Sequence, residues 1–454
     1  MPAILLRKEP FGGIAALAGG DTVRILDHVG FKAFECVAKR MSDDESLIKI
    51  ATLFPKTDPA RIHSLIALCR GLVDSPQAWE TIKHARLGDE SNTSFPTLSF
   101  PLDMSWEITR KCNQFCQHCY NNSSNDGHHP SWQQLERVLD ELDSTQLRSL
   151  TITGGEPMMR KDFKYFSERV ERLAFNRILS SNATLIAPTN IGWISRIYKQ
   201  ASISIDVANK ESYEEFRGRR GSYERCIRGL RLLREHGVDV LAQTTLSFHN
   251  FSVIEELADL LASLDIRSWS VRIPFRSGRA LHNGAIFLDR SRLVESAEKL
   301  SQLREQLLPR FDDLKMGVNY LQSYHEPYTP TENPNSLMTC AAATILATLN
   351  ADGRLSPCAL FSETNFKSEP VWNTSLKEQW QNAACMNDMR NIHLKDIKGC
   401  GTCSNSRGSC GGGCRAKSYL AYGTIYRSDN DCNYSQLFSD TGDRSKQTIP
   451  IVSG

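Results

Sequence analysis

Short apolar runs alternate with amphipathic segments between about residues 100 and 310. Six runs have the length and the β-branched or aromatic content typical of strands: SWEIT (105–109), SLTIT (149–153), RILSS (177–181), SISID (202–206), VLAQTTL (240–246) and WSVRI (269–273). Strands alternating with helices predict a parallel sheet, and six β/α units predict a partial (β/α)6 TIM-like barrel. Ligands are then expected at the carboxyl ends of the strands.

The helical period is clearest in the first and fifth of these units. Ser131 with Gln134, and Ser252 with Glu255, have the spacing of a capping box, so both helices are expected to begin at the serine. The apolar stripes that follow are Leu135, Val138, Leu139 and Leu142 in the first helix and Ile254, Leu257, Leu261 and Leu264 in the fifth.

The N-terminal residues 1–90 form a block of their own. Strand-like runs surround the turn Gly19-Gly20-Asp21, and helix patterns follow near 29–40 and 59–73, which predicts a winged-helix-like α+β module. Turn-forming residues in GDESNTSFPTLSFP (88–101) predict a linker. We therefore expect a module over 1–90, the barrel over 101–310 and a cysteine-rich domain over 335–440.

Composition restricts the partners. The chain has 454 residues, 40% of them apolar, which predicts two or three domains. Lys and Arg number 54 against 52 Asp and Glu, so the basic excess that nucleic-acid binding requires is missing. No apolar run is long enough to span a membrane, and the N-terminus MPAILLRKEPFGG carries charges where a signal peptide is apolar. We expect a cytoplasmic protein.

Cysteines carry the first chemical signal. The chain has 14, concentrated in two regions, and in a reducing compartment such clusters predict metal ligands rather than disulfides. Directly after the first barrel strand, Cys112, Cys116 and Cys119 have C-x3-C-x2-C spacing. Three thiolates on one loop can hold three irons of a 4Fe-4S cluster and leave the fourth open to chelate S-adenosylmethionine (SAM). The alternative is a buried helical stripe at i, i+4 and i+7.

A second motif follows the second strand. Gly154-Gly155-Glu156-Pro157 stands at the barrel end where ligands bind. The two glycines allow a ligand to approach the backbone, and the carboxylate can pair with the amine of a bound amino acid.

These two motifs, over about residues 101–280, resemble the radical SAM superfamily. The resemblance implies that Cys112, Cys116 and Cys119 bind a SAM-cleaving 4Fe-4S cluster. It implies further SAM contacts by Gly154, Gly155 and Glu156 to the methionine amine, by Ser204 in the fourth strand, and by Arg217 in FRGRRGS (216–222) to the carboxylate. No catalytic residue beyond these cofactor-binding positions is predicted.

The C-terminal cysteines resemble the SPASM domain, a radical SAM extension with auxiliary 4Fe-4S clusters. They are Cys340, Cys358, Cys400, Cys403, Cys410, Cys414 and Cys432, and the six residues between Cys403 and Cys410 are one more than the family usually has. By position, Cys400, Cys403, Cys410 and Cys432 would hold one cluster. Cys340, Cys358 and Cys414 would hold a second, whose fourth ligand is missing because 320–339 contains no cysteine. The alternative is a zinc ribbon of Cys400, Cys403, Cys410 and Cys414.

Four cysteines remain: Cys36, Cys69, Cys226 and Cys385. We assign all four to packing, since buried cysteine commonly behaves as a small apolar side chain. Cys385 lies within the metal-rich block and is the alternative candidate for the missing ligand.

The N-terminal block resembles the PqqD-like recognition domain of enzymes that mature ribosomally made peptides. Such a domain offers a sheet edge to an extended leader peptide; the alternative is a capping or dimerisation domain. With FRGRRGS and PCALF (357–361), the chain is similar to maturases of the subtilosin type. The resemblance implies hydrogen abstraction from a precursor peptide, formation of a thioether or carbon–carbon crosslink, and an electron donor such as flavodoxin or ferredoxin.

Two other functions fit the pattern less closely. A maturase of anaerobic sulfatases would oxidise a Ser or Cys of a protein with the same clusters, and would have little need of residues 1–90. A zinc-dependent binding protein would have no catalysis, and metal analysis would identify it.

Overall fold

The computed structural model describes residues 4–17, 23–75, 79, 96–288, 295, 301–316, 340–401, 403, 412–429 and 432. The predicted turn at 19–21, most of the linker, the segment 320–339 and Cys410 lie outside these residues. The chain divides into two compact units. The first is Met1–Leu288, Arg304–Met316 and Ala341–Asn391, and the second is Asp289–Leu303, Gly317–Cys340 and Ile392–Gly454.

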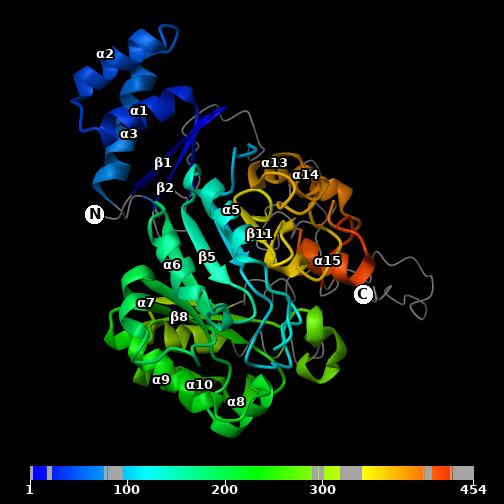
Figure 1. Ribbon diagram of the computed structural model, residues 1–454. Coiled ribbons are helices and arrows are strands. Elements are labelled where there is room, and N and C mark those ends of the chain that lie inside the picture. The colour runs from blue at the N-terminus through cyan, green and yellow to red at the C-terminus, as the bar shows by residue number, and fades with distance from the viewer. Residues whose placement is uncertain are drawn as a thin grey trace. The chain divides into compact units, whose positions relative to one another are not determined.

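A nine-stranded sheet forms the centre of the described part of the first unit, in the order β10-β9-β8-β7-β6-β5-β4-β11-β12 (Figure 1). Its strands are β4 (Asp103–Glu107), β5 (Ser149–Thr153), β6 (Asn176–Ser181), β7 (Gln200–Ser204), β8 (Asp239–Thr245), β9 (Ser268–Arg272), β10 (Asp313–Met316), β11 (Leu346–Leu349) and β12 (Leu355–Ser356). Neighbours are parallel except for β12, which runs antiparallel to β11. The six predicted strands are β4 to β9, so the predicted α/β fold with a parallel partial barrel is confirmed.

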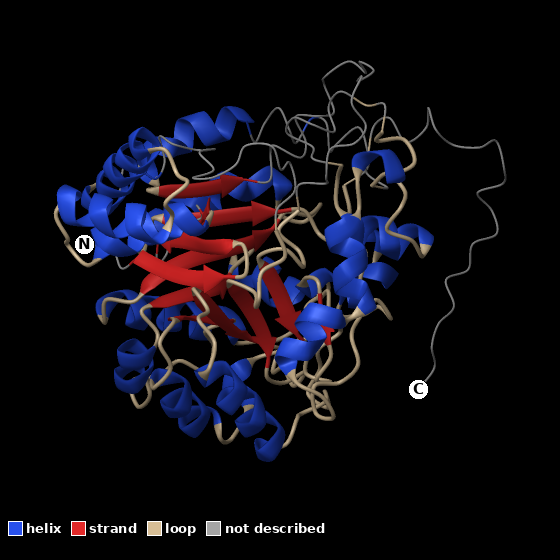
Figure 2. Ribbon diagram, turned by 90° about the horizontal axis from the view of Figure 1, so that it is seen from above, coloured by secondary structure: helices blue, strands red, loops and turns tan. Residues whose placement is uncertain are grey.

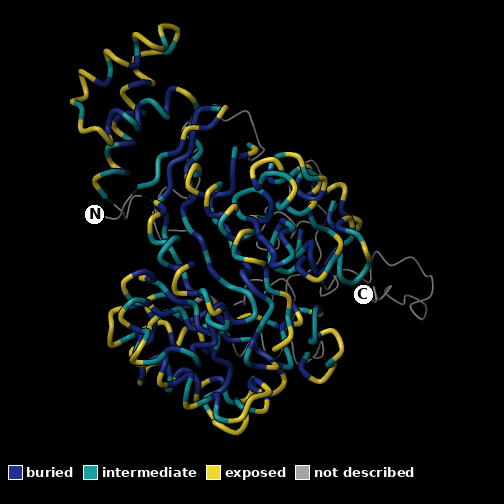
Figure 3. Tube along the Cα trace, viewed as in Figure 1, coloured by how far each residue is buried: buried dark blue, intermediate teal, exposed yellow. Residues whose placement is uncertain are grey.

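Helices connect successive strands, as the alternating pattern predicts, and lie outside the curved sheet (Figure 2). They are α5 (Trp132–Asp143), α6 (Phe163–Glu171), α7 (Ile191–Ile197), α8 (Lys210–Arg217), α9 (Ser222–Glu235) and α10 (Ile254–Ser263). Their apolar faces are buried and their polar faces exposed (Figure 3). Buried and less buried residues alternate along β5, β7 and β8, so each of these strands has one fully buried face.

The two predicted capping boxes have different outcomes. Ser131 and Gln134 form a complete capping box at the start of α5, which is confirmed. The prediction for Ser252 and Glu255 is wrong, because a 3-10 turn at Phe251–Val253 precedes α10 and no side chain caps that helix. Asn250 instead uses its side chain to accept from the Ser247 backbone.

The sheet also contains strands that the apolar pattern did not reveal. β11 pairs in parallel with β4, with Ala347 opposite Met104, although it comes from the region assigned to the cysteine-rich domain. β10 extends the opposite edge beside β9. Both strands have four residues, too short for a distinctive period, and tertiary pairing decides their structure.

The N-terminal module has a three-stranded antiparallel sheet and three helices. They are β1 (Ile4–Glu9), β2 (Gly12–Leu17), β3 (Val23–Leu26), α1 (His28–Ala38), α2 (Asp43–Leu53) and α3 (Pro59–Asp74). Helices α1 and α3 confirm the two predicted patterns, while α2 was not predicted. Ala15 and Leu26 on one sheet face pack against apolar side chains of the helices to form the module's core.

The other face of this small sheet meets the start of the barrel. The buried Arg7 guanidinium pairs with Glu9 and donates to the backbone carbonyls of Phe100, Pro101 and Gln146. Glu9 also accepts from the backbone N–H of Ser99. The Arg7–Glu9 ion pair thus joins the module to the barrel by hydrogen bonds. The spacing of apolar residues in the sequence does not reveal such contacts.

The remaining described elements belong to the C-terminal half. The first unit adds α13 (Leu376–Asn382) and α14 (Ala384–Asn391), and the second unit contains α15 (Arg415–Tyr422). Among the described helices, none combines the length and the apolar character that crossing a membrane requires.

Candidate active site

The Cys112–Cys119 segment is an irregular loop at the carboxyl end of β4. It contains no helix, so the alternative of a helical i, i+4, i+7 stripe is wrong. The Cys112 and Cys116 side chains are buried and Cys119 is half-buried. The loop therefore brings three thiols to the sheet end where parallel α/β folds bind ligands.

The thiols influence one another. Burial raises the pKa of Cys112 to about 12, and the neighbouring Cys116 adds to this shift. Burial also raises the pKa of Cys116, against the Arg217 guanidinium, whose Nη1 lies 3.7 Å from the Cys116 sulfur. Thiolates, rather than thiols, bind metals, so a bound cation would have to offset this cost of ionisation.

As they stand, the thiols face amide oxygens of their own loop. Cys116 donates to the Gln114 side chain at 3.7 Å, and Cys119 to the Asn121 side chain at 3.2 Å. Within the described ranges, no three His, Cys, Asp or Glu side chains converge closely enough to hold a metal ion. The donor set nevertheless fits a cluster, because three thiols share one buried loop and interact with one another electrostatically.

The segment after β9 holds this loop in place, a role that sequence reasoning missed. Arg279 donates from Nε to the Cys116 carbonyl at 3.0 Å and from Nη1 to the Ser123 carbonyl at 2.6 Å. Its backbone N–H donates to the Cys119 carbonyl at 2.9 Å, and Ser277 donates to the Tyr120 carbonyl. The only sequence signal is that these residues follow a barrel strand.

The Gly154-Gly155-Glu156 turn packs against the chain itself. Gly154 has φ +152°, and a Cβ there would lie 2.2 Å from the Thr109 carbonyl oxygen. The N–H groups of Gly155 and Glu156 donate to the carbonyls of Thr109 and Lys111, each at 2.8 Å. The glycines therefore allow close contact with the backbone that leads into the cysteine loop.

Replacing Gly154 by alanine should destabilise the protein by about 3 kcal/mol, through backbone strain and collision with Thr109. Thermal or urea unfolding measures the change. The matched control is Gly192→Ala on α7, where a Cβ meets no atom within 4 Å; it should be neutral or stabilising by up to about 1 kcal/mol. Equal losses in the two variants would contradict the packing argument.

Glu156 is fully buried and bound by neutral donors. Its carboxylate accepts from the Ser181 hydroxyl at 2.9 and 3.0 Å, from the Asn182 N–H at 2.8 Å and from the Met158 N–H at 3.2 Å. Burial raises the pKa of this carboxyl to about 7, and the hydrogen bonds only partly oppose the shift. A buried carboxylate without a cation is suited to receive a positively charged or amine-bearing ligand.

This shift predicts a pH dependence. Because the folded pKa of about 7 lies above the ordinary pKa of 4.5, the protonated carboxyl contributes stability that is complete below about pH 4.5 and is lost as pH rises through about 7. Glu156→Gln cannot ionise, so the stability advantage of the unmodified chain over this variant should shrink by about 3 kcal/mol between pH 5 and 8.5. Thermal unfolding of both metal-free proteins across this range measures it. A pH-independent difference would contradict the raised pKa.

Arg217 lies at the end of α8, behind the cysteine loop. Its guanidinium is buried, forms a close ion pair with Asp206 and contacts the Cys116 sulfur. Asp206 follows β7, two residues after the half-buried Ser204. The structure thus brings Arg217 to the cysteine loop, while its charge is matched by Asp206, which sequence reasoning had not singled out.

In the second unit, Asp429 draws two predicted ligand segments together. Its carboxylate accepts from the Cys414 N–H at 2.9 Å, and its carbonyl accepts from the Cys432 N–H at 2.9 Å. Burial raises the pKa of Cys414 to about 11, and Cys340 contributes to the shift, so these thiols are near one another. Cys400 and Cys403 share one turn, in which the Cys403 N–H donates to the Cys400 carbonyl. Cys410 lies outside the described residues.

The cysteines assigned to packing are all buried: Cys36, Cys69, Cys226 and Cys385 are 1%, 0%, 0% and 6% exposed. Cys358 and Cys385 belong to the first unit, whereas the other described C-terminal cysteines belong to the second.

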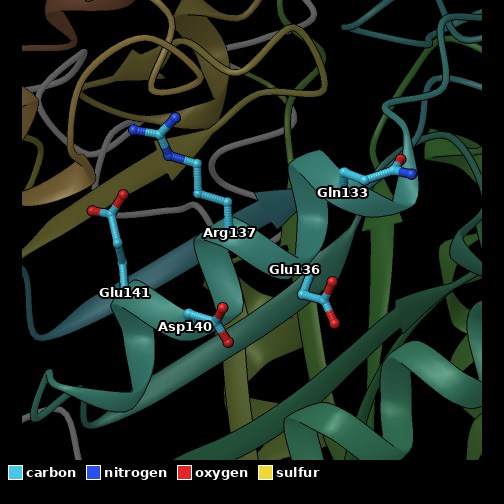
Figure 4. A pocket seen from close by; sticks show the side chains of 5 residues that line it. All are labelled: Gln133, Glu136, Arg137, Asp140 and Glu141. Atoms are coloured by element: carbon cyan, nitrogen blue, oxygen red, sulfur yellow. The ribbon is translucent and has the colours of Figure 1, made fainter.

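A shallow hollow lies over the outer face of α5 (Figure 4). Its lining is Gln133, Glu136, Arg137, Asp140 and Glu141. Arg137 donates to the carbonyls of Trp372 and Thr374, and Glu141 accepts from the Leu376 N–H. These side chains fasten the segment before α13 to the barrel, so we assign them a structural role.

Comparison with known proteins agrees with this geometry. Residues 106–261 match the family model described as the Radical SAM superfamily. These residues are a radical SAM domain. The match covers the cysteine loop, the Gly154–Glu156 turn, Ser204 and Arg217. The chain is accordingly an enzyme with a radical SAM domain, and its cofactors are SAM and a 4Fe-4S cluster.

Proteins similar to this chain have names that describe different activities. An AdoMet-dependent heme synthase of Oleidesulfovibrio alaskensis is 26% identical over 363 residues, which cover 75% of this chain and 89% of that protein. The subtilosin biosynthesis protein AlbA of Bacillus subtilis is 26% identical over 310 residues, covering 63% and 64%. Streptococcus suis SuiB, solved with its precursor peptide SuiA, has a TM-score of 0.69 at 17% identity and covers 95% of this chain and 98% of that one.

Proposed function

We propose that the radical SAM enzyme abstracts a hydrogen atom from a ribosomally synthesised precursor peptide and forms a thioether or carbon–carbon crosslink. The observation that carries the proposal is the buried three-thiol loop at the carboxyl end of β4, held in a chain that also has a separate N-terminal α+β module. An enzyme acting on small molecules alone would have no evident use for such a module.

Each residue of the loop region has a place in this chemistry. Cys112, Cys116 and Cys119 would hold the cluster, which when bound supplies the electron that cleaves SAM to methionine and the hydrogen-abstracting 5′-deoxyadenosyl radical. Glu156 offers a buried carboxylate to the methionine amine. Because Arg217 is already paired with Asp206, it would hold the SAM carboxylate only by sharing its guanidinium.

The N-terminal sheet offers one edge to a leader peptide. β3 pairs only with β2 among the described strands, while β1 adjoins residues 99–101 through Arg7 and Glu9. An extended leader would add beside β3 by main-chain hydrogen bonds. The resemblance to SuiB, which binds a precursor peptide, supports this assignment.

The C-terminal cysteines would hold two auxiliary 4Fe-4S clusters. The proximity of Cys340 to Cys414, and of Cys414 and Cys432 to Asp429, supports a shared metal-binding region in the second unit. An incompletely ligated cluster would leave an iron for a substrate thiolate or for the electron released after hydrogen abstraction. An electron carrier such as flavodoxin or ferredoxin completes the cycle.

Incubation with the product of a short neighbouring open reading frame, SAM and dithionite tests the proposal. We expect 5′-deoxyadenosine together with a peptide lighter by about two hydrogens per crosslink, read by mass spectrometry. A peptide without its leader should react at least about tenfold less efficiently. Failure of the reconstituted protein to form 5′-deoxyadenosine would overturn the proposal.

The heme synthases favour a second candidate, because their names describe tetrapyrrole chemistry and the match covers most of their length. If the enzyme acted in this way, an iron tetrapyrrole precursor would be consumed in the same assay and the peptide would not. The N-terminal module then would not affect turnover.

A further inference from the structure

We propose that the outer surface of the cysteine loop is the docking site for a small acidic one-electron carrier protein. The site consists of Phe115 and four surrounding arginines, Arg219, Arg220, Arg276 and Arg279, and we call it the basic rim. The proposal rests on the proposed function, since the carrier would serve the cluster held by Cys112, Cys116 and Cys119.

Phe115 is the apolar centre of the rim. It lies between Cys112 and Cys116, and it is 56% exposed although both neighbouring cysteines are buried. Its backbone N–H donates to the Arg217 carbonyl at 3.0 Å, which fixes the loop with the ring outward. A large exposed ring next to buried cysteines is typical of a contact surface, because aromatic residues and arginine are enriched at protein interfaces.

The arginines come from two segments. In the segment after β9, the Arg279 guanidinium stacks on the Phe115 ring at 3.9 Å, and Arg276 stacks at 4.0 Å on Phe287. Phe287 packs against the cluster of Phe216 and Ala280, so Arg276 belongs to the same region. In the segment after α8, Gly218 lies against the Phe115 backbone and leads directly into the exposed Arg219 and Arg220.

The charge of the rim is not balanced locally. Throughout the described residues, Arg219, Arg220 and Arg276 have no carboxylate within ion-pair distance. The adjoining helix α8 carries three carboxylates: Glu214, which accepts from the Tyr223 N–H, and the exposed Glu211 and Glu215. The whole chain has a net charge of only +2, so this concentration of arginines would steer an acidic partner to one place.

The position suits electron entry. Phe115 belongs to the loop that carries the three thiols, so a carrier docked on it would lie beside the cluster. One electron would pass from the carrier's reduced prosthetic group to the cluster. The prosthetic group would be oxidised by one electron, and the cluster would be reduced by one electron. No proton or other group would be transferred at the rim.

A charge-reversal pair tests the rim with reduced flavodoxin as the probe. Arg219→Glu/Arg220→Glu is compared with Arg228→Glu/Arg231→Glu, which makes the same charge change at exposed positions of α9. Affinity for flavodoxin is measured by titration calorimetry on the reconstituted proteins, and cluster reduction by stopped-flow absorbance. We expect the rim variant to weaken binding and slow reduction by flavodoxin at least about tenfold, and the control by less than about twofold.

Dithionite separates this proposal from the proposed function. Both variants should form 5′-deoxyadenosine with dithionite as rapidly as the unmodified protein. Equal losses of flavodoxin affinity in the two variants would overturn the assignment of the basic rim as the docking site. The same assignment would be overturned if the rim variant bound flavodoxin unchanged and bound the precursor peptide more weakly. If the unmodified protein forms no 5′-deoxyadenosine with dithionite, the proposed function fails, and the flavodoxin affinities still decide the docking site.

Discussion

Simultaneous replacement of Cys112, Cys116 and Cys119 by alanine is expected to reduce SAM cleavage to background and to remove about four irons and four sulfides per chain. The three thiols share one loop and interact electrostatically, and the triple variant leaves that loop without a thiolate ligand. Iron and sulfide analysis of the reconstituted variant, with chromatography of 5′-deoxyadenosine, measures both losses. The C-terminal clusters should retain their iron.

Cys69→Ala is the matched control. Its thiol is fully buried in the N-terminal module, where burial alone raises the pKa of the thiol to about 12. Iron content and SAM cleavage should be unchanged, with a loss of stability of about 1 kcal/mol from the cavity. If the triple variant kept its full iron content, the assignment of the three cysteines would be wrong.

Arg7→Met should destabilise the attachment of the N-terminal module by about 3 to 5 kcal/mol, because it removes one partner of a buried ion pair. The variant leaves the Glu9 carboxylate buried without its cation. It also leaves the carbonyls of Phe100, Pro101 and Gln146 without their donor. Urea unfolding followed by circular dichroism should show an earlier transition or a lower midpoint.

Two further variants identify the cause of this loss. Lys8→Met removes a charge from an exposed position of the same strand and should change stability by less than about 0.5 kcal/mol. Adding Glu9→Gln to Arg7→Met removes the unpaired charge and should recover part of the lost stability. If Arg7→Met and Lys8→Met caused equally small losses of stability, the ion pair would not hold the module in place.

The barrel could be predicted because its signals are local. Each strand from β4 to β9 is a short strand-forming run next to an amphipathic segment, so the alternation of strand and helix is visible within about ten residues of sequence. β11 could not be found in this way, since its four residues pair with β4 from a distant part of the chain. The α10 capping box failed because a 3-10 turn competes for the same residues.

The candidate site divides in a similar way. Cysteine spacing after β4 located the three thiols, and the position of Gly154–Glu156 after β5 located the carboxylate beside them. The spacing could not show that Gly154 contacts Thr109, or that Asp206 pairs with Arg217. It also gave no sign of Arg279, whose contacts to the cysteine loop depend on how the β9 end packs.

The sequence by itself determined the kind of fold and which three thiols share one loop, because periodicity and cysteine spacing are properties of neighbouring residues. Only the tertiary structure decided which charges are matched, which backbone atoms touch and which surface of the cysteine loop remains exposed. Those features depend on residues such as Arg7, Arg217 and Arg279, each of which has a partner far away in the chain. A polar side chain acquires its role from the carbonyls and carboxylates that packing places around it.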